Sequence, residues 1–128
     1  MREVFLVGVG GFVGSALRFK IGALALHYLG SRFPVGTLIV NLAGCLVIGT
    51  LAGLAEKHDV LSPEVRLLLL TGFLGGFTTF SAFGLETVAL MRQAKLSTAL
   101  LNIGVNVLGG LLMVWLGLKL AGAPSPKP

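Results

Sequence analysis

The stretch from Thr71 to Glu86 reads TGFLGGFTTFSAFGLE and lies inside a long apolar segment of the chain. It nevertheless contains four glycines, three threonines, a serine and a glutamate, and three phenylalanines follow the glycine pair within seven residues. Adjacent glycines weaken a helix, because glycine loses more backbone freedom on folding than any other residue. The sequence therefore predicts a helix that breaks midway, at Gly75–Gly76.

The rest of the chain identifies the environment of this broken helix. Of 128 residues, 55% are hydrophobic and 12% are charged, and the mean hydropathy is +0.94. A membrane-spanning helix needs about 20 mostly apolar residues, and four stretches are candidates: 4–29, with a pause at Arg18 and Lys20, then 33–55, 67–85 and 96–118. We predict an all-α integral membrane protein with four transmembrane helices over residues 1–121. The proline-rich end, 122–128, is predicted to be a disordered tail.

Two local patterns predict how these helices begin and pack. Ser62, Pro63 and Glu64 have the residue types favoured at the N-cap and first turn of a helix, so the third helix should begin there. Gly10 and Gly14 form a small-xxx-small pair on the first helix, which lets helix backbones approach closely.

The basic residues are shared equally between the two sides of the membrane. One side would hold Arg2, Lys57, Arg66, Lys119 and Lys127, and the other Arg18, Lys20, Arg32, Arg92 and Lys95. Because Lys/Arg asymmetry orients membrane proteins, this tie predicts dual topology, unless one or two particular charges decide the orientation. The basic residues are scattered, without a stripe or interleaved aromatic patch, so nucleic acid is not an expected partner.

Polar side chains follow one face of two predicted helices. Thr37 and Asn41 are four residues apart on the second helix, and Asn102, Asn106 and Gly110 repeat the same spacing on the fourth. Unsatisfied amides in hydrocarbon are costly, so these groups need partners. Two interpretations stay open: hydrogen bonds that join helices, or a polar track along a water-filled path.

A broken transmembrane helix can serve an ion in two ways. Its freed carbonyls can coordinate a cation, and the start of its second half offers N–H groups and a positive dipole end to an anion. Thr78 and Thr79 can cap that second half. Phe80 and Phe83 share a face, and phenyl rings have positive edges that can contact a small anion; simple packing or lipid contact is the alternative for these rings.

The segments GGFTTFSAFGLE, GTLIVN on the second helix and GSALR on the first closely resemble the Fluc (CrcB) family of fluoride channels, and the resemblance covers nearly the whole chain. It implies an antiparallel, dual-topology homodimer with two pores, which agrees with the tie in charge. It also implies a structural sodium ion at the dimer interface, held by the backbone carbonyls of Gly75 and Thr78 from both subunits.

The resemblance also implies the residues of a fluoride pathway, with Glu86 as the glutamate of the third helix. Ala82, Gly110 and Val114 depart from the hydroxyl residues common in the family, and Asn102 and Asn106 can compensate as amide donors. The expected pathway residues are Phe80, Phe83, Asn41, Ser81, Thr79, Arg18 and Asn106.

These features predict passive, fluoride-selective export through a channel in the bacterial plasma membrane, and not an enzyme. The first alternative is a small proton-coupled transporter of cationic drugs, which would need an acid deep in a span. Glu86, which directly follows the stretch 67–85, is the only acid expected to be embedded in the membrane, and it lies late in the third helix near Arg92. The second alternative is a structural membrane subunit without transport.

Overall fold

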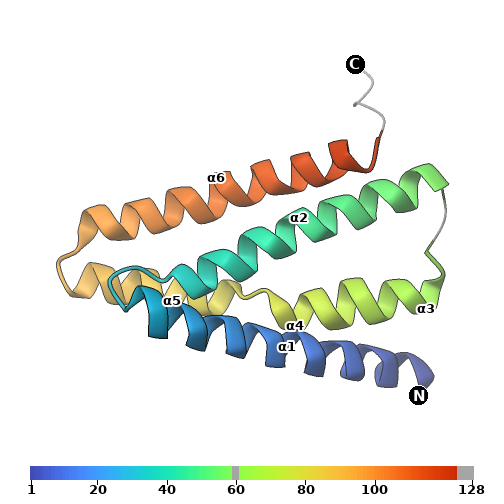
Figure 1. Ribbon diagram of the computed structural model, residues 1–128, viewed down its shortest axis with the longest axis horizontal. Coiled ribbons are helices and arrows are strands. Elements are labelled where there is room, and N and C mark those ends of the chain that lie inside the picture. Colours follow the sequence, from blue (N-terminus) through green and yellow to red (C-terminus); the bar gives the residue numbers. More distant parts are fainter. Residues whose placement is uncertain (59–60, 124–128) are drawn as a thin grey trace.

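Four long apolar helices lie side by side in the computed structural model, which describes residues 1–58 and 61–123. Within these residues, four helical spans are long and apolar enough to cross a membrane, so the predicted all-α architecture is confirmed. The spans are α1 (Arg2–Leu29), α2 (Val35–His58), a third span built from α3 (Pro63–Arg66), η1 (Leu67–Leu74), α4 (Gly75–Phe77) and α5 (Phe80–Arg92), and α6 (Leu96–Leu120). Both ends of the described chain lie at the same end of the bundle (Figure 1).

The first half of the third span packs against α1 through backbone contacts between small residues. A Cβ atom at Gly14 would collide with the carbonyl of Phe73, and one at Gly10 with the carbonyl of Leu68. From the other side, a Cβ at Gly76 would lie 2.5 Å from the carbonyl oxygen of Gly11. The close packing predicted for Gly10 and Gly14 is therefore confirmed, and it holds α1 against the segment before the break.

The second close helix pair is α2 with α6. A Cβ at Gly49 would collide with the carbonyl of Val114, and one at Gly117 with the carbonyl of Leu46. The half-helix α5 packs mainly on α6. The two halves of the third span thus rest on different partners, and the break lies between the α1 side and the α6 side of the bundle.

The outward faces of the helices are apolar. On α1, Phe5, Phe12 and Phe19 are each at least 70% exposed, whereas the buried apolar cluster around the break consists of Val40, Leu74 and Phe77. Such an arrangement suits a bundle surrounded by lipid tails or by another apolar chain. In lipid, apolar side chains gain little free energy from burial inside the protomer, so they can remain on its outer surface.

The third span is broken midway, as predicted, but the predicted position was wrong. Gly75 has helical dihedral angles (φ −62°, ψ −36°), and the helix continues to Phe77. The backbone is extended at Thr78 (φ −86°, ψ 162°) and Thr79 (φ −154°, ψ 114°), two residues after the glycine pair. Glycine permits a departure from the helix but does not require one. At Gly76 the absence of a side chain instead allows the close approach to α1.

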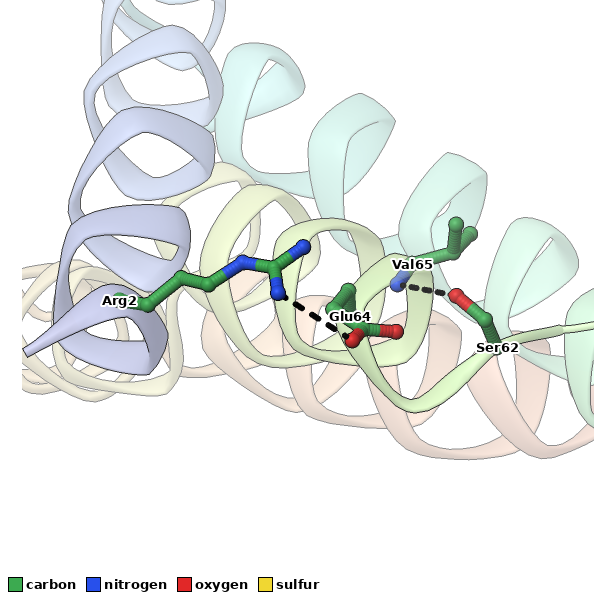
Figure 2. A network of polar contacts seen from close by, with 4 residues as sticks. All are labelled: Arg2, Ser62, Glu64 and Val65. Carbon is green, nitrogen blue, oxygen red and sulfur yellow. Dashed lines mark hydrogen bonds and ion pairs between the residues drawn. The ribbon is translucent and has the colours of Figure 1, made fainter.

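The start of the third span follows its predicted pattern. The hydroxyl of Ser62 accepts a hydrogen bond from the amide of Val65 (3.3 Å), and Pro63 occupies the first turn. Arg2 of α1 lies beside this turn, with its Nη1 3.9 Å from Oε1 of Glu64 (Figure 2). Both side chains are exposed, so this ion pair adds little stability. The predicted tail lies largely outside the described residues, which end at 123.

Candidate functional site

An open groove of about 530 Å³ lies between α2, α6 and the two sides of the break. Asn41, Thr78, Thr79 and Asn106 supply polar atoms to its wall, and none of its lining residues carries a formal charge. Most of the remaining wall is apolar. Gly110 and Val114 also line it, so the two departures from the family on α6 fall on the groove itself.

Two threonines end one half-helix and begin the next. The hydroxyl of Thr78 donates to the carbonyl of Leu74 (2.9 Å), and the amide of Thr78 donates to the same oxygen (3.0 Å). The hydroxyl of Thr79 instead accepts from the amide of Ala82 (3.2 Å) and caps α5. Of the two caps predicted for the second half-helix, Thr79 is thus confirmed, whereas Thr78 closes the first half.

Asn41 replaces the missing helical partners of Thr79 on both sides. Its Oδ1 accepts from the Thr79 amide (2.9 Å), and its Nδ2 donates to the Thr79 carbonyl (3.2 Å). One asparagine on α2 therefore holds the unwound residue by both of its backbone groups, as a neighbouring strand would.

The side chains that satisfy the break leave particular carbonyls without their helical donors. In a continuous helix the Thr79 amide would donate to the carbonyl of Gly75, and the Ala82 amide to that of Thr78. Both amides are bonded to side chains instead. The carbonyl of Gly76, by contrast, accepts from Nε of Arg18 (3.0 Å).

A chain of hydrogen-bonded side chains connects Asn41 to Thr87 and Phe83 of α5. Nδ2 of Asn41 donates to Oδ1 of Asn106 (3.1 Å), and Nδ2 of Asn106 donates to both the Oδ1 (2.9 Å) and the carbonyl (3.0 Å) of Asn102. Nδ2 of Asn102 donates to the hydroxyl of Thr87 (2.9 Å), which donates to the carbonyl of Phe83 (2.7 Å). We call Asn41, Asn106, Asn102 and Thr87 the asparagine relay.

Thr87 is a member of the relay that the sequence did not single out. It lies one helical turn after Phe83 and is buried, as is Asn102, which has no exposed surface. The only sequence signal for it is the four-residue spacing from Phe83 on a helix that faces asparagines. A threonine at that spacing ordinarily bonds within its own helix, so its contact with Asn102 is visible only in the structure.

The predicted pathway residues fall into two groups. Asn41, Thr79, Phe80, Phe83 and Asn106 meet at the groove. The rings of Phe80 and Phe83 lie 5.5 Å apart between centroids at 54°, and Phe80 is 82% exposed whereas Phe83 is 8% exposed.

The remaining two predicted residues lie beside the groove. Ser81 is exposed, with its hydroxyl 3.3 Å from that of Thr79. Arg18 lies on the α1 side and donates to the carbonyl of Gly76, in the last turn before the break. Neither Ser81 nor Arg18 lines the groove.

Glu86 lies in a second cavity, of about 330 Å³, which Thr37 also lines. The hydroxyl of Thr37 donates to Oε1 of Glu86 (2.7 Å), so the predicted shared face of Thr37 and Asn41 does point at the third span. Oε2 of Glu86 is buried and has no hydrogen-bond partner among the described residues. Glu86 does not line the groove that contains the phenylalanines.

Comparison with known proteins assigns the chain to a family. A family model described as "CrcB-like protein, Camphor Resistance (CrcB)" matches residues 5–118. A protein of Methylobacillus flagellatus named "Fluoride-specific ion channel FluC" is 52% identical over 121 residues, which cover 94% of each chain. Proteins with the same name from Chlorobium phaeobacteroides and Chlorobaculum tepidum are each 47% identical, over 92% and 94% of this chain and 91% and 95% of their own. The chain belongs to the CrcB family.

Proposed function

We propose that this protein is a fluoride-selective channel that lets fluoride leave the cytoplasm passively. The observation that carries the proposal is the groove at the break, where two phenylalanine rings, the start of α5 and the amides of Asn41 and Asn106 come together without a formal charge. Relatives that share about half of the residues are named fluoride-specific channels. A channel of this family is not an enzyme, and its four apolar spans make it a multi-pass protein of the bacterial membrane.

The groove offers a small anion weak and evenly shared attraction. The positive end of the α5 dipole lies at Thr79 and Phe80, and phenyl ring edges carry partial positive charge. An ion channel must bind its ion well enough to admit it and weakly enough to release it. Partial charges from rings and a helix end meet both requirements, whereas an arginine in the groove would retain the anion; Arg18 is occupied with Gly76 instead.

Proton-coupled transport of cations is less consistent with the position of Glu86. That alternative needs an acid in the substrate path. The carboxylate of Glu86 is bonded to Thr37 in the smaller cavity, apart from the groove at the break. A cation transporter would also gain little from a groove wall that presents ring edges and a helix N-terminus.

An antiparallel homodimer with dual topology belongs to the same proposal. Its support is the equal division of ten basic residues and the open side of the groove at Gly75, which is exposed and where an added Cβ would meet nothing within 4 Å. A second copy, inserted in the opposite direction, would cover this surface.

The broken helix provides carbonyl oxygens suited to coordinate a structural sodium ion at that interface. The carbonyls of Gly75 and Thr78 have lost their usual helical donors to Asn41 and Thr79, and backbone carbonyls freed in this way are ligands that sodium accepts. We propose that these two carbonyls, from each subunit, hold it. When bound, the ion would supply positive charge to carbonyl dipoles that lipid cannot satisfy.

Fluoride efflux from liposomes that contain only this protein tests the channel proposal. Reconstituted protein should release fluoride and retain chloride under the same gradient. Equal release of both anions would exclude selectivity, and release of neither would favour the structural-subunit alternative. A flux that rises with an applied proton gradient and disappears in Glu86→Gln, but not in Thr37→Ser, would favour coupled transport.

A further inference from the structure

The asparagine relay begins and ends on backbone groups of the same half-helix. It leaves α5 at Thr79, passes through Asn41 on α2 and Asn106 and Asn102 on α6, and returns through Thr87 to the carbonyl of Phe83. We propose that Thr87 and Asn102 are positioning residues of the ion pathway, because they set the orientation of the amides that hold the broken helix. This inference rests on the proposed function only for its effect on flux.

The orientation of Asn41 is determined by the backbone of Thr79. A backbone N–H can only donate and a carbonyl can only accept. The side-chain oxygen of Asn41 must therefore face the Thr79 amide, and its NH₂ group must face the Thr79 carbonyl. The second N–H of Asn41 then requires an acceptor, which is Oδ1 of Asn106.

The other end of the relay imposes the same direction. The hydroxyl of Thr87 gives its single proton to the carbonyl of Phe83, so only its lone pairs remain to receive Nδ2 of Asn102. Oδ1 of Asn102 must then face Asn106 and accept its Nδ2. Asn106 uses both N–H groups on Asn102 and offers its oxygen to Asn41. At every step of the relay a hydrogen-bond donor of one residue therefore faces an acceptor of the next.

The consequence is that the N–H groups of Asn41 and Asn106 are already engaged. In this arrangement the two amides shape the groove and hold Thr79, and with it the start of the helix that carries Phe80 and Phe83. Removing the Thr87 hydroxyl leaves Nδ2 of a fully buried Asn102 without its acceptor. If Asn102 turns over to escape, its NH₂ group faces the NH₂ group of Asn106, and the mismatch passes to Asn41.

The three asparagines of the relay are the only asparagines in the chain. Protein labelled with ¹⁵N in asparagine side chains therefore gives three NH₂ pairs, assigned by replacing each asparagine in turn, and all three report on the relay. Proton exchange of these groups with water should be measured in the parent protein and in Thr87→Val, which matches the shape of threonine. Thr87→Ser retains the hydroxyl and is the conservative rescue.

Thr50→Val is the matched control. Thr50 also donates to the carbonyl four residues earlier, that of Leu46 (2.9 Å), but no asparagine is bonded to it. Only variants that elute from size exclusion at the parent volume are compared. If Thr87→Val does not fold, Thr87→Cys replaces it, because a thiol is a weak acceptor.

Thr87→Val should accelerate exchange of all three NH₂ groups, including that of Asn41, which is three residues along the relay from Thr87, while Thr87→Ser and Thr50→Val leave them unchanged. Fluoride efflux should fall about tenfold in Thr87→Val alone, a factor that corresponds to about 1.4 kcal/mol. Unchanged exchange at Asn41 and Asn106 in Thr87→Val would overturn the inference. If the parent protein releases no fluoride yet its amides respond as described, the proposed function fails and the relay stands.

Discussion

At the scale of single residues, Phe80 and Phe83 can be separated by their exposure. Phe80 is 82% exposed and Phe83 is 8% exposed, so only Phe83 contributes much to packing within the protomer. Phe80→Ile keeps an apolar side chain but removes the polarised ring edge. We expect fluoride efflux from liposomes to fall at least about tenfold in Phe80→Ile, with unfolding in detergent unchanged. Normal flux in the double variant with Phe83→Ile would show that the rings only pack.

Gly75 and Gly76 are neighbours with opposite requirements. A methyl group at Gly76 would lie 2.5 Å from the carbonyl oxygen of Gly11 and 3.0 Å from the hydroxyl of Ser15, whereas one at Gly75 would meet nothing in the protomer. Gly76→Ala should therefore destabilise the protomer by about 1–3 kcal/mol, as overpacking does. Gly75→Ala should leave the protomer intact and weaken the dimer. Thermal unfolding and subunit exchange, measured on both variants, distinguish these effects, and the reverse pattern would contradict the arrangement of the break.

At the scale of elements, length and hydropathy were sufficient to predict four spans, and Ser62 and Pro63 to predict where the third begins. The break was predicted at Gly75–Gly76, three residues before its position at Thr78–Thr79. The glycine pair marks weakness in a helix, but the competition of Asn41 and Thr79 side chains for backbone amides determines where the helix ends. That competition involves a residue 38 positions away in the chain, which no local pattern reveals.

The sequence predicted most residues of the candidate site, but not the hydrogen bonds that join them. Spacing placed Asn102 and Asn106 on one face, Asn41 on a face with Thr37, and Phe80 on a face with Phe83, and the resemblance then implied the roles of Phe80, Phe83 and Asn41 in the pathway. Thr87 was missed because its bond to Asn102 depends on how α5 packs on α6. The π-helical stretch Leu67–Leu74 was missed as well, since a run of leucines indicates an apolar helix and nothing about its winding.

At the scale of the whole molecule, dual topology can be measured directly. Single cysteines at Lys57 or Arg92, in a Cys45→Ala background, should each be labelled from both sides of the membrane in cells, because the basic residues are equally divided. Lysines added to the C-terminal tail should bias insertion and lower fluoride flux. Labelling from one side at both positions would rule out dual topology.

The proposed sodium ion should be required for the dimer and not for the anion path itself. Purification in a buffer with a much larger cation in place of sodium should weaken subunit association or abolish flux, since the carbonyls of Gly75 and Thr78 would lose the ion that they coordinate. Thr78→Ser should be mild, because the carbonyl and the hydroxyl bond to Leu74 are both retained. Identical association and flux after long exchange, with sodium shown to be absent, would assign the break another role.

The contacts of the glycines have a consequence for mutational tolerance. Where a glycine touches a neighbouring backbone, as Gly10 and Gly117 do, alanine is excluded by space alone. Gly8, Gly22, Gly84 and Gly104 lie within helices and have open space where a Cβ atom would be added, and in a protomer surrounded only by lipid their replacement by alanine would stabilise the helix by about 0.5–1 kcal/mol. Alanine substitution at each of these glycines would therefore locate the partner subunit from the sign of the change in stability. Higher stability indicates a position that faces lipid, and lower stability indicates a surface that another copy covers.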